Sequence, residues 1–185
     1  MMPSATAYRM TSAEFFQLPA GPPYFQLIDG DLYMSPSPRR YHQQLSMRLS
    51  LLLGGFIEDH NLGELYAAPS DVALANDIVL EPDLYFVSHE RAGILTDQGA
   101  TGAPDLVIEI LSPSTAKMDL GRKREIYATA GVREMWIIAP ETRTVEIHRF
   151  AENPGESALL LQAGDFIESP IFPGLKAPVA GVFKD

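Results

Sequence analysis

Apolar residues recur at helical spacing between about residues 39 and 60. The positions that carry this spacing are Leu45, Leu49, Leu52 and Phe56. Steps of four, three and four residues place them on one face, so we predict an amphipathic helix that buries this stripe. His42 lies near the start of that helix, and Gly63 follows its end.

The residues before this helix predict a short helix and a hairpin. Thr11 and Glu14 have the spacing of a helix N-cap and its acidic partner, which predicts a helix that stops before the next proline. Apolar stretches then flank Asp29-Gly30, a turn pair in which glycine tolerates positive φ. We therefore predict a hairpin over residues 24–35.

After residue 63 the apolar period shortens to that of strands. Short strand candidates, separated by turn residues, lie at 64–68, 71–74, 78–80 and 83–88. Residues 89–102 are polar and contain glycine, which predicts a mobile loop. Residues 106–111 are nearly all apolar, which predicts a central strand covered on both faces, with Glu109 as its one acidic residue.

The remaining pattern predicts one more helix and a second hairpin. The helix spans residues 119–130 and is capped by Gly131, and the hairpin joins 135–139 to 144–150. A weak strand at 158–161 precedes a tail of coil interrupted by prolines.

This order of elements indicates a mixed α/β sandwich of the α+β type, with neither a dinucleotide-binding nor a P-loop glycine motif. Because no repeat or linker divides the chain, we expect one domain over residues 1–185. Within it we expect an N-terminal helix and hairpin (11–38), a core (39–150) and a C-terminal extension (151–185).

Composition narrows the classes of function. The 185 residues are 46% hydrophobic and 21% charged and include no cysteine, which excludes disulfides, thiolate metal sites and a cysteine nucleophile. No leader pattern or membrane-length apolar run is present, so we expect a soluble, cytoplasmic protein. The net charge of −10 argues against a generally basic surface for nucleic acid. However, six of the 14 basic residues gather near the starts of the two main helices: Arg39, Arg40, Lys117, Arg122, Lys123 and Arg124.

Glu109 is the most informative residue for chemistry. A carboxylate inside a covered strand costs several kcal/mol unless it is paired or holds a metal, so a structural salt bridge and a functional site both stay open. Asp105 shares its face of the strand, but four residues of strand separate the two by roughly 13 Å, too far for one ion to bridge. We therefore interpret Asp105 as a strand-entry or supporting residue.

A second ligand must come from a neighbouring strand, and Asp83 opens one just after a proline. Taken alone, Asp83 is more readily interpreted as a turn carboxylate. Lys123 shares a helical stripe with Leu120, Tyr127 and Ala130, a position where a lysine either meets a carboxylate or extends to solvent. Two carboxylates and a lysine suit phosphodiester hydrolysis, because carboxylate oxygens hold Mg²⁺ or Mn²⁺ and the lysine orients water or stabilises charge.

These residues lie in three longer blocks, at 81–84, 103–115 and 119–138. With segments 27–32, 35–42 and 169–175, these blocks make the chain resemble, over almost its whole length, the Uma-two family of bacterial restriction-endonuclease-like proteins in the PD-(D/E)XK superfamily. The resemblance implies an αβββαβ core with an added N-terminal helix and hairpin. It also implies that Asp83 and Glu109 are the two acids of the superfamily motif.

The superfamily lysine belongs two residues after the second acid, where this chain has Leu111. Lys123, on the later helix, resembles a migrated replacement. The polar residue common on the first helix of such sites corresponds to His42 or Gln43, and the matching blocks add Ser112 and Tyr127 as further candidates. Arg39, Arg40, Lys117, Arg122 and Arg124 are candidate phosphate contacts.

Three hypotheses follow. The first is a Mg²⁺-dependent (or Mn²⁺-dependent) DNA endonuclease that works as a homodimer, since related folds often pair subunits to cut two strands. The second is a non-catalytic binding or regulatory module with a protein or nucleic-acid partner, which Leu111 favours. The third treats Glu109 and Lys123 as a structural ion pair.

Overall fold

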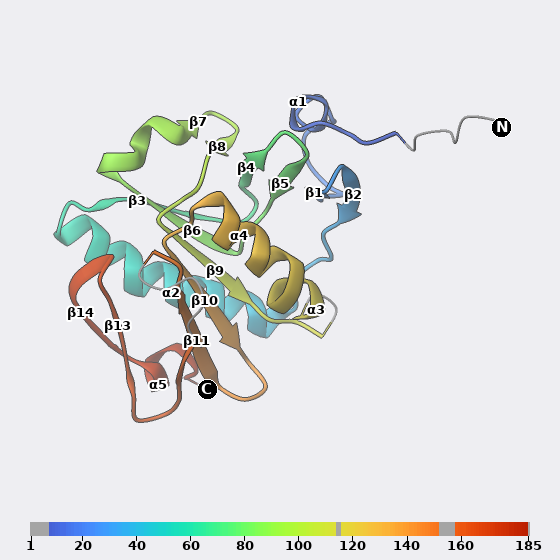
Figure 1. Cartoon of the computed structure of the whole chain (residues 1–185). Coiled ribbons are helices and arrows are strands. Elements are labelled where there is room, and N and C mark those ends of the chain that lie inside the picture. The colour runs from blue at the N-terminus through green and yellow to red at the C-terminus, as the bar shows by residue number, and fades with distance from the viewer. Residues whose placement is uncertain (1–7, 114–115, 152–157, 185) are drawn as a thin grey trace.

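The computed structural model describes residues 8–113, 116–151 and 158–184, and its elements are shown in Figure 1. Those of the first half are α1 (Ser12–Phe15), β1 (Phe25–Ile28), β2 (Asp31–Met34), α2 (Arg40–Asp59), β3 (Gly63–Ala67), β4 (Asp71–Ala75), β5 (Ile78–Leu80) and β6 (Leu84–Ser88). Those of the second half are β7 (Leu95–Thr96), β8 (Gly99–Thr101), β9 (Leu106–Ile110), α3 (Ala116–Met118), α4 (Arg124–Ala130), β10 (Glu134–Ala139), β11 (Thr144–Arg149), β12 (Leu159–Leu161), β13 (Phe166–Ser169), β14 (Phe172–Pro178) and α5 (Val179–Val182).

A six-stranded sheet in the order β12-β11-β10-β9-β6-β3 forms the centre of the molecule (Figure 1). β9 runs parallel to β10 and antiparallel to β6, and all five of its residues are buried. The chain order contains an αβββαβ unit, which consists of α2, β3, β6, β9, the helical segment from α3 to α4, and β10. The predicted α/β class and the restriction-endonuclease-like core are therefore confirmed.

The two faces of this sheet are covered by different parts of the chain. Because side chains alternate along a strand, Leu84, Leu106 and Ile108 face α2 and the C-terminal elements. Tyr85 and Val107 face the other way, into a second apolar cluster that includes α4 and parts of the N-terminal sheet. The result is a sheet packed between two layers.

The N-terminal sheet has the order β2-β1-β5-β4-β8-β7 and lies on the α4 side. Its hairpin turns at Asp29 and Gly30, both with positive φ, as the turn pair predicts. The capping box that opens α1 is also formed, since the Thr11 side chain accepts from the Glu14 N–H and the Glu14 carboxylate accepts from the Thr11 N–H.

Two regions differ from the prediction. Residues 89–102, expected to be a mobile loop, contain a 3₁₀ segment at His89–Ile94 and the short strands β7 and β8. The tail, expected to be coil, forms the hairpin β13–β14 and the helix α5. Prolines are tolerated there because each strand of a two-stranded sheet has an open edge.

The stripes of the two main helices also differ in detail. Helix α2 buries Leu53 and Ile57 with Leu45 and Leu49, while the predicted Leu52 and Phe56 are only partly buried against the same core. The helix predicted at 119–130 begins earlier, at α3, and includes a π-helical turn at Asp119–Lys123.

That turn changes which side chains face the sheet, because i→i+5 hydrogen bonds widen it by one residue. Leu120, predicted to be on the buried stripe, is 42% exposed, and Asp119 is buried instead. Gly131 caps the helix in a left-handed conformation, as predicted. No helix in the described ranges is both long enough and apolar enough to cross a membrane.

Candidate active site

Asp83 and Glu109 stand opposite each other on neighbouring strands. Leu84 pairs with Ile108 in the antiparallel register of β6 and β9, so the next position along places Asp83 across from Glu109. Directly opposed residues project to the same face, about 5 Å apart at Cβ. The Asp83 Oδ2 atom also accepts a hydrogen bond of 2.7 Å from the Ile110 N–H, which fixes this carboxylate against β9. The sequence prediction of a partner from a neighbouring strand matches this arrangement.

Glu109 is buried and held by two donors. Lys123 Nζ lies 3.1 Å and the Tyr127 hydroxyl 2.7 Å from its Oε1 atom. Burial raises the pKa of the Glu109 carboxyl to about 8. The Lys123 ammonium opposes this rise, and the negative charges of Asp119 and Asp83 add to it. Glu109 therefore takes up a proton far more readily than an ordinary glutamate.

Lys123 lies between two buried carboxylates. Its Nζ atom is 3.1 Å from Glu109 Oε1 and 3.1 Å from Asp119 Oδ1, and its side chain is 5% exposed. Burial acts to lower the pKa of Lys123, but the charges of Glu109 and Asp119 outweigh burial and raise it. The lysine is therefore a fixed positive charge, oriented by residues of the strand and of its own π-helical turn.

His42 approaches the site from the first turns of α2. Its Nε2 atom lies 3.2 Å from Asp83 Oδ1. Burial acts to lower the pKa of His42, but the hydrogen bond and the charge of Asp83 outweigh it, so the pKa is raised. The Asp83 carboxylate is thus held by two contacts, one from the backbone of β9 and one from the histidine of α2.

The charges at the site do not balance. Asp83, Glu109 and Asp119 are three acids, whereas Lys123 is one permanent cation and His42 a titrating one. Asp119 Oδ1, although within ion-pair distance of Lys123, has no partner with hydrogen-bond geometry in the described part of the chain. A hard divalent cation neutralises such an excess of carboxylate oxygen.

Among the described residues, no group of three or more histidine, aspartate or glutamate side chains is gathered tightly enough to form a complete metal cage. Mg²⁺ does not require one, because it is usually held by one or two carboxylates and completes its octahedron with water and substrate phosphate. The pair Asp83 and Glu109 fits that pattern.

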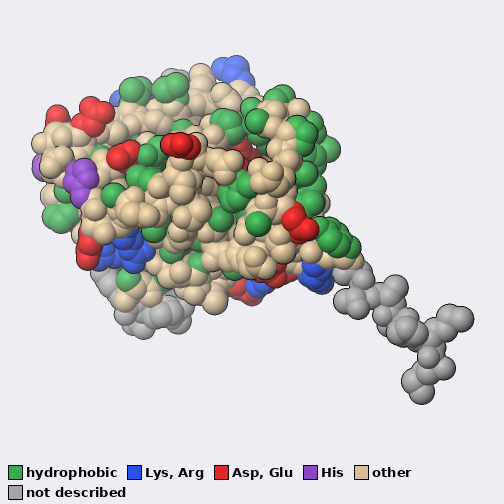
Figure 2. Space-filling view, turned by 90° about the horizontal axis from the view of Figure 1, so that it is seen from above, with side chains coloured by type: hydrophobic (Ala, Val, Ile, Leu, Met, Phe, Trp, Pro, Cys, Tyr) green, Lys and Arg blue, Asp and Glu red, His purple; other side chains and the backbone are tan. Residues whose placement is uncertain are grey.

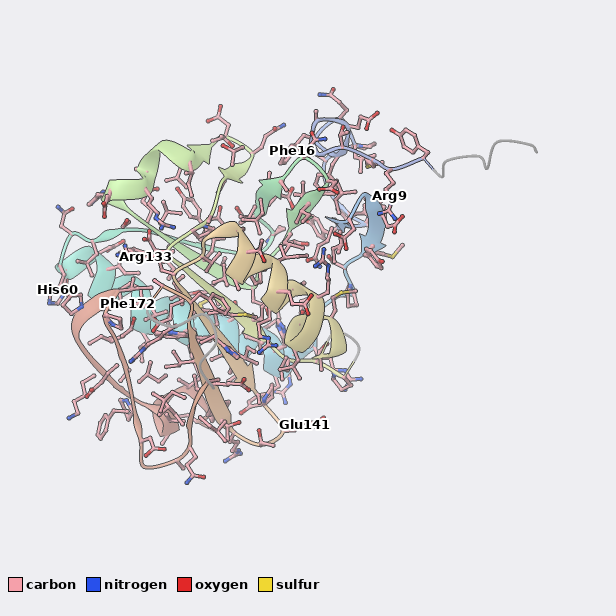
Figure 3. All side chains as sticks on the ribbon, in the orientation of Figure 1. Arg9, Phe16, His60, Arg133, Glu141 and Phe172 are labelled. Atoms are coloured by element: carbon pink, nitrogen blue, oxygen red, sulfur yellow. The ribbon has the colours of Figure 1, made fainter. Side chains whose placement is uncertain are left out.

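Asp105, a second-tier candidate, lies outside this cluster. It is fully buried at the other end of β9, where Arg133 donates to its Oδ1 at 2.9 Å and the Ser88 N–H donates to its Oδ2 at 2.7 Å. Figures 1 and 3 show Arg133 and α3 near opposite ends of the central strands. The strand geometry had already separated Asp105 from Glu109.

Tyr127 belongs to the site through its hydrogen bond to Glu109. Two other second-tier candidates, Gln43 and Ser112, lie on α2 and shortly after β9. Gln43 lies on α2 beside His42 with an exposed side chain. Ser112 follows β9, and its carbonyl oxygen accepts a hydrogen bond of 2.9 Å from the Ala116 N–H at the start of α3.

The candidate phosphate-binding residues differ in exposure and in their partners. Arg39 and Arg40 begin α2 with exposed side chains, and Arg124 is exposed on α4. Arg122 instead forms an ion pair with Asp29 of the β1–β2 turn and also contacts Glu125. Lys117 lies in α3, but its side chain is outside the described residues.

Sequence reasoning missed two acids of this region. Asp119 is four residues before Lys123, and this i,i+4 spacing was the signal that could have linked them. Glu81 is half-buried two residues before Asp83, and burial raises its pKa. A hydrogen bond with Ser35 opposes that rise, and Lys123 and Asp83 are among the charges that act on Glu81.

Comparison with known proteins agrees with the predicted family and fold. Residues 12–180 match a family model, Uma2, described as "Putative restriction endonuclease". The chain belongs to the Uma2 family. Because this match spans nearly the whole chain, the predicted family resemblance is confirmed, and the αβββαβ unit lies within the matched residues.

Two further proteins are similar to this Uma2 chain. The uncharacterized protein slr1290 of Synechocystis sp. is 28% identical over 158 residues, which cover 77% of this chain and 75% of that protein. A crystal structure from Anabaena variabilis ATCC 29413, described as "a putative nuclease belonging to DUF820", superposes with a TM-score of 0.80 at 19% identity. That superposition covers 94% of this chain and 97% of the other, so the whole fold is shared.

Proposed function

We propose that this protein hydrolyses phosphodiester bonds of DNA with the help of Mg²⁺ or Mn²⁺ held by Asp83 and Glu109. The observation that carries the proposal is the position of Asp83, immediately before β6 and across from Glu109 of β9, in a cluster that has more acids than bases. The family description and the nuclease description of the structural neighbour support the same class of reaction.

Each residue of the cluster has a distinct part in this proposal. A divalent cation bound by the two carboxylates supplies a water of lowered pKa and neutralises charge on the phosphate. Lys123, held by Asp119, orients the attacking water and stabilises the developing negative charge. His42 keeps Asp83 in place, and Tyr127 fixes Oε1 of Glu109.

The substrate binds, in this proposal, across the start of α2. Arg39 and Arg40 are exposed there, on the helix that carries His42, and Arg124 is exposed on α4. A local group of arginines lets an acidic protein with a net charge of −10 contact phosphates at one place only. We further propose that two copies act together to cut both strands, in the cytoplasm.

The test is a nicking assay on supercoiled plasmid DNA with Mg²⁺ or Mn²⁺, using Asp83→Ala and Glu109→Ala. Both variants should lose metal-dependent nicking while keeping the circular dichroism spectrum of the native protein. Glu141→Ala, an exposed acid in the β10–β11 turn, is the matched control and should nick normally. Nicking that persists in both site variants would exclude this site.

One observation favours a second candidate, a non-catalytic binding module. Leu111 stands at the usual lysine position, and Lys123 and Tyr127 already donate to the same Glu109 oxygen. A closed structural pair of this kind binds no metal. Calorimetry with Mn²⁺ separates the two candidates, because only the nuclease requires heat of metal binding that depends on Asp83.

A further inference from the structure

A groove with a volume of about 300 Å³ lies between α1, the segment that leads into β1, and the start of β4. Aromatic side chains form part of its lining, among them Phe16, Tyr24 and Phe25. Figure 3 places Phe16 next to β4 and β5, and in the view of Figure 2 hydrophobic side chains gather on the side from which the N-terminal trace leaves. The volume is at the small end of ligand pockets, which suits one planar ring system.

Asp71 contributes a carboxylate to the lining of this groove. Its side chain is half-buried, and no hydrogen bond or ion pair to its carboxylate is found in the described part of the chain. Burial alone raises the pKa of Asp71 to about 6. Glu81 also lines the groove, so two acidic residues share its lining with the aromatic rings. Such a lining repels a phosphate and favours a ligand that donates hydrogen bonds.

The groove adjoins the candidate active site through Glu81. This residue lines the groove, and Asp83 lies two residues further along the chain, a separation of roughly 7 Å in extended backbone. The charges of Asp83 and Lys123 both act on Glu81. A nucleotide whose phosphate lies at Asp83 therefore has the groove beside it.

We propose that the groove binds one unpaired, amino-bearing base of the substrate strand. The ring stacks against the aromatic lining, and the exocyclic amino group donates to Asp71. Both contacts are known elements of nucleic-acid recognition: stacking on aromatic side chains tolerates any base, while a carboxylate accepts specifically from an amino group such as N4 of cytosine. The proposal rests on the proposed function, since it takes the strand to be the one that crosses Asp83 and Glu109.

Thymine distinguishes this proposal from general stacking, because thymine lacks an exocyclic amino group. The experiment measures the anisotropy of fluorescein-labelled single-stranded octamers, dC8 and dT8, titrated with the full chain. Ca²⁺ replaces Mg²⁺ during the titration, and cleavage with Mg²⁺ is measured in parallel. The native protein should bind dC8 about tenfold more tightly than dT8.

The variants assign that preference to the groove. Asp71→Ala should bring dC8 down to the affinity of dT8, whereas Phe16→Ala should weaken both octamers about tenfold. Glu141→Ala, the exposed control, should leave both affinities unchanged. Asp71→Ala should also keep the native thermal midpoint, because the carboxylate it removes has no partner in the described residues.

Equal binding of dC8 and dT8 by the native protein, or a preference that persists in Asp71→Ala, would overturn the groove as a base site. A competition titration with arginine amide adds a further check. If arginine amide binds in the groove and neither octamer does, the base site is overturned in favour of a cationic protein partner. Cleavage that still depends on Asp83 in those cases leaves the proposed function standing. Absence of metal-dependent cleavage by the native protein overturns the proposed function, whatever the result of the anisotropy titrations.

Discussion

Asp105, immediately before β9, and Glu109, within β9, are both buried and lie four residues apart, yet their surroundings differ. Asp105 is met by Arg133, by Arg91 at 3.4 Å, and by the Ser88 N–H. One acid therefore faces two permanent cations and a backbone donor. This is the environment of a carboxylate that serves the fold, because its charge is more than balanced.

Glu109 shows the opposite balance. Three acids share Lys123 and a titrating histidine. Burial raises the pKa of Glu109 to about 8, and the charges of Asp119 and Asp83 add to this rise. The two buried acids therefore differ in the balance of charge around them. The charge of Asp105 is already balanced by its two arginines, whereas a proton or a metal ion can neutralise the charge of Glu109. The predictions below test this difference.

The largest expected effect is on catalysis at the Glu109 end. Lys123→Met should lower metal-dependent cleavage by roughly 100- to 1,000-fold, because a fixed positive charge at the phosphate is lost. Lys176→Met, at a lysine that is 62% exposed, is the control and should cleave normally. Lys123→Arg keeps the charge and should retain more activity than Lys123→Met. Native cleavage rates in Lys123→Met would remove the lysine from the mechanism.

The next effect is on stability at the Asp105 end. Asp105→Ala should lower the free energy of unfolding by about 3 kcal/mol, at the lower end of the range for broken buried pairs because Arg91 and Arg133 can turn to solvent. At about pH 5, where Glu109 is protonated in the folded state, Glu109→Gln should change it by no more than about 1 kcal/mol. Urea unfolding without metal measures both. Equal losses in the two variants would make Glu109 a structural ion-pair residue like Asp105.

A third effect depends on pH. The folded pKa of Glu109 lies above its ordinary value of 4.5, so the folded state holds a proton that the unfolded state has released. That contribution to stability is fully present below about pH 4.5 and is lost as the pH rises through about 8. Urea unfolding of the metal-free protein from pH 5 to 8.5 should show the fall, and Glu109→Gln should flatten it. A native curve as flat as that of the variant would contradict the raised pKa.

The smallest effect calibrates the others. The ion pair between Arg122 and Asp29 is about 40% exposed on both sides and joins the π-helical turn to the β1–β2 turn. Exposed pairs contribute little, so Arg122→Ala should change the free energy of unfolding by less than about 1 kcal/mol. A loss as large as that of Asp105→Ala would mean that an exposed ion pair contributes as much to the stability of this protein as a buried one.

Much of this comparison could be predicted from sequence. The apolar block around Glu109 indicated a covered strand, and the separation of roughly 13 Å along a strand excluded Asp105 as a ligand partner. The need for a ligand from the neighbouring strand pointed to Asp83, which the register of β6 and β9 places opposite Glu109. These steps depend on strand periodicity, which the sequence carries directly.

Other features depend on contacts that a local pattern does not contain. The π-helical turn that buries Asp119 and exposes Leu120 follows from i→i+5 bonding, which has no periodic signature over a single turn. The strands β7 and β8 have two and three residues, too few for an alternation to be recognised. The hairpin β13–β14 contains prolines that predict coil, and only pairing between its two edge strands overrides them.

The central claim is that Asp83 and Glu109 form a metal site, and calorimetric titration with Mn²⁺ tests it most directly. The native protein should bind Mn²⁺, with an affinity that rises about tenfold per pH unit up to about pH 8 as Glu109 gives up its proton. Asp83→Asn and Glu109→Gln should lose that binding, while Glu141→Gln, at the exposed control position, should keep it. No heat of binding in the native protein, or the same affinity in the site variants, would contradict the claim.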